Sequence, residues 1–89
     1  MNTTELIQIN ISGPDRSGLT ADLTEILAKY DATILDIGQA DIHHTLALGL
    51  LVKTDSKRSG DILKELLIKT GALNVQVHFD LVGEEDYNN

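Results

Sequence analysis

The seven residues from Gly13 to Leu19 have the clearest capacity for chemistry in this sequence, because they leave a predicted strand and open a predicted helix. Free amide groups at the start of a helix carry partial positive charge and can hold a carboxylate. The side chain of Asp15 can accept hydrogen bonds from an ammonium group. An amino acid carries both groups, so this turn is complementary to a zwitterion. A capped turn without a ligand is compatible with the same residues, and both alternatives stand at this point.

Other kinds of site are disfavoured by the residue types present. The turn lacks the glycine and lysine pattern of a phosphate-binding loop and the three glycines of a dinucleotide-binding turn. His43 and His44 are adjacent, so on a strand they point to opposite faces and cannot grip one metal ion together. We expect both at an exposed hairpin tip, and His78 on the surface. The chain has no cysteine, which excludes disulfides and thiolate zinc sites. We therefore expect no metal and no cofactor.

Catalysis by this chain alone is not expected. No Asp-x-Asp motif is present, which a phosphatase of the haloacid dehalogenase kind needs for its nucleophile. Asp36 and Asp41 lie five positions apart in one predicted strand, so they face different sides. No serine stands in a Gly-x-Ser-x-Gly elbow.

The composition limits the partners. The 89 residues include 7 basic and 14 acidic side chains, which give a formal charge of −7. Such a chain repels phosphate backbones and anionic lipids, so we expect neither a nucleic acid nor a membrane as partner. Aromatic residues make up only 3%, too few for a platform on which bases stack. Without an evident signal peptide or an apolar span, we expect a cytoplasmic protein.

The periodicity of the apolar residues predicts six elements in one domain. Period-two alternation predicts strands at 6–11, 33–42, 45–53 and 75–81, with a hairpin broken at His43-His44. Helical spacing predicts a helix from Ser17, capped by Asp15 or Ser17, to about Tyr30-Asp31, with Gly18 allowing close approach of its first turn to another backbone. After a polar connection at 54–60, a second helix is predicted to end at Gly71 in a left-handed cap.

This order predicts an α+β fold: a ferredoxin-like βαββαβ two-layer sandwich, with a four-stranded antiparallel sheet and two helices on one face. The uncovered face should carry polar or small residues, namely Gln8, Asn10, Ala47, Gly49, Gln76 and His78. The strand at 33–42 has apolar residues at both parities. This pattern predicts either pairing with another chain or simple core packing.

The sequence Asp15-Arg16-Ser17-Gly18-Leu19 after a strand resembles the Asp-Arg-Pro-Gly-Leu motif of ACT domains, with Ser17 in place of the proline. The resemblance covers nearly the whole chain, as one domain at 1–89 with an ordered core at about 5–82 and an acidic tail at 83–89. More narrowly, the segments 35–40, 42–43 and 46–49 look like the N-terminal ACT segment of some bacterial phosphoserine phosphatases.

The resemblance implies a regulatory domain that binds an amino acid, with serine or glycine as the expected ligand. It also implies a homodimer or higher homo-oligomer, and a parent or associated protein of serine or glycine metabolism such as a phosphoserine phosphatase. A module of the same fold that only dimerises, without a ligand, is the alternative. In the family, ligands contact the turn after the first strand and the start of the second strand, often from a neighbouring subunit. The residues implied are Asp15, Arg16, Ser17, Gly18, Leu19, Thr33, Ile34, Leu35 and Asp36.

Overall fold

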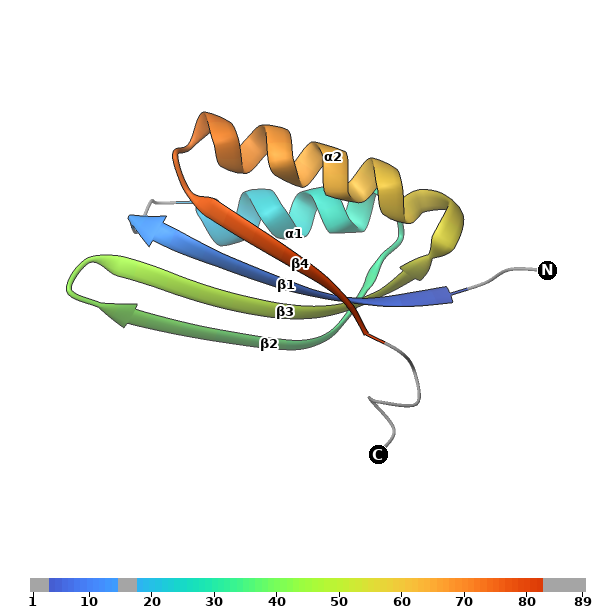
Figure 1. Ribbon diagram of the computed structural model, residues 1–89, viewed down its shortest axis with the longest axis horizontal. Coiled ribbons are helices and arrows are strands. Elements are labelled where there is room, and N and C mark those ends of the chain that lie inside the picture. The colour runs from blue at the N-terminus through green and yellow to red at the C-terminus, as the bar shows by residue number, and fades with distance from the viewer. Residues whose placement is uncertain (1–3, 15–17, 83–89) are drawn as a thin grey trace.

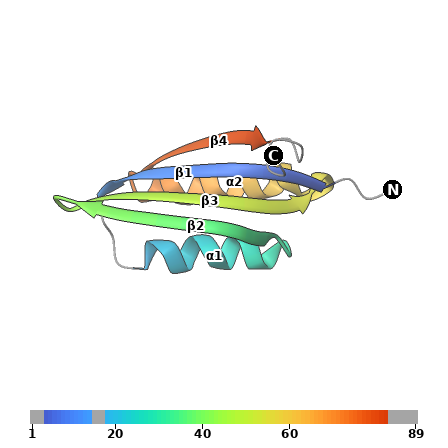
Figure 2. The same cartoon turned by 90° about the horizontal axis from the view of Figure 1, so that it is seen from below.

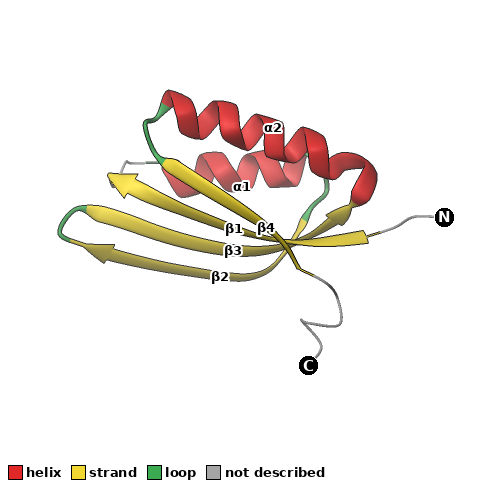
Figure 3. Ribbon diagram, viewed as in Figure 1, coloured by secondary structure: helices red, strands yellow, loops and turns green. Residues whose placement is uncertain are grey.

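The computed structural model describes residues 4–14 and 18–82, which form two layers, a sheet and a pair of helices (Figures 1 and 3). In chain order the elements are β1 (Thr4–Pro14), α1 (Leu19–Lys29), β2 (Thr33–Ile42), β3 (Thr45–Asp55), α2 (Ser56–Ala72) and β4 (Gln76–Val82). The predicted βαββαβ fold is confirmed. Within the described ranges, neither helix is long and apolar enough to cross a membrane.

The sheet has the strand order β2-β3-β1-β4, and every neighbouring pair is antiparallel. Both helices lie on the same side of it (Figure 1), and Figure 2 shows α1 toward the β2 edge of the sheet. Among the described residues, β2 and β4 are therefore the two edges of the sheet that no further strand pairs with. Each exposes a row of backbone groups that a further strand could pair with.

The register assigns each side chain to a face of the sheet. Residues directly opposite each other in an antiparallel ladder point to the same face. Ile9 lies opposite Leu50 and Phe79, facing the helices, while Asn10 lies opposite Gly49 and His78 on the uncovered face. The six polar or small residues predicted for this face do lie on it, but the register also places the apolar residues Leu6 and Leu51 there.

A bulge in β2 explains why its sequence is apolar at both parities. Ile34 lies opposite Val52 and Asp36 lies opposite Leu51, so Leu35 is an extra residue without a partner in the ladder. Such an insertion reverses the alternation of faces beyond it. Ile34 and Ile37 therefore share the face toward the helices, although they are three residues apart. The bulge therefore accounts for apolar residues at both parities, and pairing of this strand with another chain stays a prediction.

The hairpin tip is a two-residue turn. His43 and His44 both have positive φ, 51° and 67°, between the opposed residues Ile42 and Thr45. Positive φ at both central residues is the type I′ pattern that matches the twist of paired strands. Both histidines are exposed, as predicted.

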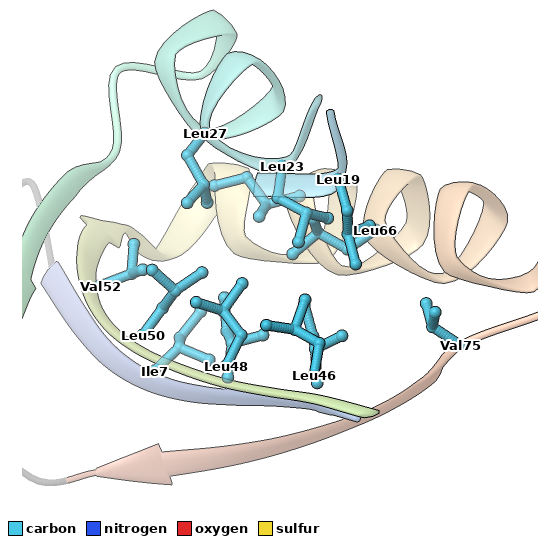
Figure 4. Packing of buried hydrophobic residues seen from close by; sticks show 13 residues of the cluster. Ile7, Leu19, Leu23, Leu27, Leu46, Leu48, Leu50, Val52, Leu66 and Val75 are labelled. Carbon is cyan, nitrogen blue, oxygen red and sulfur yellow. The ribbon is translucent and has the colours of Figure 1, made fainter. Parts of the chain in front are cut away.

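Aliphatic side chains build the core between the layers, as Figure 4 shows. Leu19, Leu23 and Leu27 point from α1 toward β3, and Leu66 joins them from α2. Each of these four side chains is at most 1% exposed. The core therefore attaches α1, and with it the turn between β1 and α1, to the sheet.

Two predicted boundaries of α2 were wrong. Residues 56–60, predicted as a connection, are helical because Asp55 caps the helix: its Oδ1 accepts a 2.9 Å hydrogen bond from the Lys57 amide. At the other end Gly71 is still helical, and Asn74 takes the left-handed conformation instead, with φ 59°. Asparagine tolerates that conformation nearly as well as glycine does.

Candidate functional site

The turn between β1 and α1 is the first half of the predicted site. Asp15, Arg16 and Ser17 lie outside the described residues; Pro14 ends β1 opposite Thr45, and Gly18 precedes the helix. Leu19 is only 1% exposed, so its side chain belongs to the core. From Leu19, a ligand could contact only the backbone.

Gly18 is the N-cap residue of α1, and no side chain of the described residues caps the helix there; the predicted caps Asp15 and Ser17 lie outside these residues. Its φ is 82°, a conformation that L side chains rarely adopt. Its carbonyl accepts a 2.9 Å hydrogen bond from the Asp22 amide, the first bond of the helix. A Cβ at Gly18 would meet no atom of the described residues within 4 Å, so the expected close approach of another backbone is not seen among them. The glycine is needed for its backbone angles.

A Gly18→Ala variant should therefore be destabilised by about 1 kcal/mol through backbone strain alone. Gly18→Asn should cost less, because asparagine tolerates positive φ. Urea unfolding of the three proteins measures both differences. Equal stability of the alanine variant and the parent chain would contradict the assigned cap.

The start of β2 is the second half of the predicted site, and its four residues differ in solvent exposure. Thr33 and Asp36 are exposed, whereas Ile34 and Leu35 are partly buried. Ile34 packs against the core. Asp36 Oδ1 accepts a 2.9 Å hydrogen bond from the Ile37 amide, which fixes the carboxylate beside the strand. Thr33 and Asp36 are therefore the two side chains of this segment that a ligand could reach.

Arg58, at the start of α2, holds the turn that leads into β2. Its Nη1 donates to the Tyr30 carbonyl at 3.2 Å and to Asp31 Oδ2 at 3.0 Å. Asp31 has φ 56°, and Thr33 follows two residues later. Arg58 was missed in the sequence because it lay in a segment predicted to be a plain connection. It positions the start of β2 from another element.

The two halves of the predicted site lie at opposite ends of the sheet. Thr33 is opposite Lys53, which is opposite Leu6 near the beginning of β1, whereas the turn follows Pro14 at its end. Pro14 lies eight positions after Leu6 along the strand, which is about 27 Å at the usual rise per residue. One chain therefore cannot bring the two halves onto one small ligand.

Two depressions lie elsewhere on the surface. The larger, about 710 Å³, is an open hollow around the beginning of β4 and the end of α2, with Leu67, Gln76 and His78 in its lining. Its lining contains none of the predicted site residues that the structure describes. The smaller, about 370 Å³, runs between the two helices and is lined by Asp22, Glu25, Ile26, Lys29, Glu65 and Lys69. Neither was predicted from the sequence.

Ion pairs cross the groove between the helices. Lys29 Nζ contacts Glu65 Oε1 at 2.9 Å, and Lys69 Nζ lies 3.5 Å from Asp22 Oδ2. Hydrogen bonding to Lys29, then to Tyr30, lowers the pKa of Glu65. The same contacts with Glu65 raise the pKa of Lys29 and of Tyr30.

These pKa shifts predict a stability difference that depends on pH. A lowered carboxyl pKa stabilises the fold above the unfolded-state pKa, and this contribution is lost as the pH falls through the folded-state value. The raised pKa values of Lys29 and Tyr30 stabilise the fold until the pH rises through them. Glu65→Gln should thus lower the melting temperature slightly between about pH 5 and pH 9, and the difference should shrink below about pH 4. Thermal melts against Glu25→Gln as control measure it; a difference that grows in acid would contradict the pairing.

No group of three or more histidine or acidic side chains in the described part of the chain could hold a metal ion.

Comparison with known proteins gives consistent results. A model of the family described as ACT domain matches residues 5–80. UPF0237 protein MJ1558 of Methanocaldococcus jannaschii is 35% identical over 82 residues, which cover 90% of this chain and 88% of the relative. UPF0237 protein YjhC of Lactococcus lactis is 29% identical over 70 residues, or 79% and 80% of the two chains.

Among solved structures, an ACT domain protein from Streptococcus pneumoniae has a TM-score of 0.75 at 24% identity, covering 89% of this chain and 91% of that one. A protein described as a candidate glycine cleavage system transcriptional repressor has a TM-score of 0.85 at 15% identity. The match covers 90% of this chain but 47% of the repressor, so the present chain spans about half its length. These likenesses show the fold.

Proposed function

Because this chain belongs to the ACT domain family, a family of regulatory domains, we propose that it binds a small amino acid at a site shared by two copies of itself. The turn of one copy supplies one wall of that site, and the start of β2 of the other copy supplies the opposite wall. The observation that carries the proposal is the placement of the two predicted halves at opposite ends of one sheet.

Pairing through β2 would bring the halves together. If two copies pair their β2 edges in antiparallel fashion about a two-fold axis, the start of one β2 lies beside the end of the other. The end of β2 is next to the turn, because Ile42 and Pro14 both lie opposite Thr45. Ile37, which is 48% exposed on this edge, offers an apolar contact to the second copy.

The side chains then present groups that suit an amino acid. Amides at the start of α1 can hold the ligand carboxylate, and the acidic groups of Asp15 and Asp36 can accept hydrogen bonds from its ammonium group. The hydroxyl of Thr33 can contact a short polar side chain. We propose serine or glycine as the ligand; the glycine-related description of the structurally similar repressor is in keeping with glycine.

A narrower role stays a prediction. We propose that the chain is part of a phosphoserine phosphatase, or of another cytoplasmic protein of serine or glycine metabolism. The resemblance at 35–49 supports this role. None of the relatives named above is described as a phosphatase. A module that pairs without any ligand is the alternative function, since the β2 edge and Ile37 suit association in either case.

Calorimetric titration of the chain with glycine, L-serine and a panel of other amino acids tests the proposal. We expect binding by a small amino acid and a higher dimer fraction in its presence, because a ligand shared by two chains is linked to their association. Asp36→Ala should weaken binding, whereas Asp61→Ala, an exposed carboxylate on α2, should not. No heat with any amino acid at millimolar concentration, together with unchanged dimerisation, would favour the ligand-free alternative.

A further inference from the structure

The second free edge of the sheet carries exposed apolar side chains. We call β4 (Gln76–Val82) together with Leu67 the β4 edge. Leu81 is 71% exposed and Leu67 is 53% exposed. Leu67 and Val77 line the same hollow, on the side of α2 away from α1. Apolar groups beside an unpaired strand are typical of a surface that another strand covers.

The uncovered face of the same strand carries one cation-forming and one acidic side chain. His78 and Asp80 are two residues apart and therefore point to the same face. Their side chains are 71% and 59% exposed, and His78 Nε2 lies 3.2 Å from Asp80 Oδ2. Phe79 stands between them and points toward the helices. The strand is thus nearly symmetric about Phe79, with opposite charge character on its two sides.

We propose that a second copy of this chain pairs with the β4 edge in antiparallel fashion, about a two-fold axis that passes beside Phe79. A two-fold interface needs a surface that is complementary to itself. In this register His78 lies opposite Asp80 of the second copy, and the reverse pair forms at the same time. The imidazole of His78 can donate a hydrogen bond to the carboxylate of Asp80 across the ladder, and complementary side chains placed directly opposite each other stabilise a sheet.

The chemistry selects this register over its neighbours. Alternative registers must differ from this one by two residues. A register that differs by one residue would place the helix-facing side chains of one copy opposite the outward-facing side chains of the other. Shifting one way places Asp80 opposite Asp80 of the second copy, which is repulsive. Shifting the other way places His78 opposite His78 of the second copy. The Asp80 side chain of each copy then has no charged partner across the ladder. The register centred on Phe79 also overlaps all seven residues of β4.

The apolar side chains are compatible with the same register. Val77 lies opposite Leu81 of the second copy, and Phe79 lies opposite its equivalent, all on the helix side. Leu67 flanks this row from α2. The most exposed leucine of the sheet is thereby covered by a branched apolar partner.

This interface is separate from the one that the proposed function uses. The strands β2 and β4 are opposite edges of the sheet, so a chain that pairs through both assembles beyond a dimer. The β4 pairing needs no ligand. It can therefore be tested without added amino acid, and its outcome does not depend on whether an amino acid binds.

Charge-swap variants test the pairing by sedimentation velocity. His78→Asp should weaken the association at this edge about tenfold or more, because it places like charges in both cross-strand pairs. Asp80→Lys should weaken it as well, because it removes the carboxylate from both pairs. An equimolar mixture of the two variants should recover the mass of the parent chain, since each chain then meets the opposite charge. Both positions are exposed, so the fold should be kept, which circular dichroism checks. Asp61→Lys, at an exposed position on α2, is the matched control.

Cross-linking tests the register directly. Because the chain has no cysteine, His78→Cys and Asp80→Cys each introduce a single thiol. Oxidation of a mixture should give a disulfide-linked pair far more readily than either variant alone, since residues opposite each other lie within disulfide range. Unchanged mass in both charge variants, a parent chain that stays monomeric, or equal cross-linking of the single variants would overturn the proposal.

Discussion

A Leu23→Ala substitution is expected to lower the free energy of unfolding by about 2–5 kcal/mol. The side chain of Leu23 is fully buried between α1 and the sheet. Truncation removes its apolar area from the core and leaves a cavity that the neighbouring leucines fill only in part. Domains typically have a free energy of unfolding of about 5–15 kcal/mol. A loss of this size should weaken the packing of α1 on the sheet or leave much of the protein unfolded at 37 °C.

Equilibrium urea unfolding, followed by circular dichroism, measures the effect of Leu23→Ala. Ile68→Ala is the matched control, because Ile68 is 64% exposed on the outer side of α2 and alanine favours the helix. The control should remain within about 0.5 kcal/mol of the parent chain. Similar losses in both variants would contradict the assignment of the core.

A Gly13→Ala substitution is expected to cost about 1–3 kcal/mol, the usual range for overpacking. A Cβ at this position would lie 2.8 Å from Val75 Cγ1 and 3.1 Å from Val75 Cα. Because one of these atoms belongs to the backbone, rotation of the valine side chain cannot relieve the whole clash. The end of β1 and the residue before β4 must then move apart, close to the turn that forms half of the proposed site.

A double-mutant cycle locates the clash. Val75→Ala removes the nearest atom, so the cost of Gly13→Ala should be smaller in that background than in the parent chain. Gly38→Ala serves as the control, since a Cβ at Gly38 meets nothing within 4 Å. Strictly additive effects of the two substitutions would show that Gly13 and Val75 do not meet as described.

The elements that could be predicted are those whose apolar residues repeat with an uninterrupted period. In α1 the spacing of Leu19, Leu23 and Leu27 marks one buried stripe, and in β1 the alternation of Ile7, Ile9 and Ile11 marks one buried face. The break at His43-His44 marked the hairpin, because the polar pair interrupts two such runs. From these elements the chain order was sufficient for the fold.

The features that were missed depend on one residue or on a distant partner. The bulge at Leu35 cannot be read from alternation, because an inserted apolar residue and a two-sided strand give the same pattern. Both glycine and asparagine tolerate the left-handed conformation. The residue types alone therefore did not show that Asn74, and not Gly71, adopts it. The contact of Arg58 with Asp31 joins residues 27 positions apart, and no local pattern reports such a pair.

For the candidate site, the motif residues were identifiable but their mutual position was not. The turn after β1 and the start of β2 are each readable from local residue types. Their placement at opposite ends of the sheet follows only from the register of three strands, β1, β3 and β2. Because of this placement, the proposed site requires residues from two copies of the chain.

The most direct test of the shared site is calorimetric titration of mixed chains with the amino acid that the parent chain binds. One variant carries Asp15→Ala in the turn, and the other carries Asp36→Ala at the start of β2. Each variant alone should lose most of its binding, because every site in its dimer has one altered wall. After mixing in equal amounts, half of the dimers contain both variants and each has one intact site, so roughly a quarter of the sites should recover full affinity. If the mixture binds no better than the separate variants, both walls come from the same chain and the shared site is contradicted.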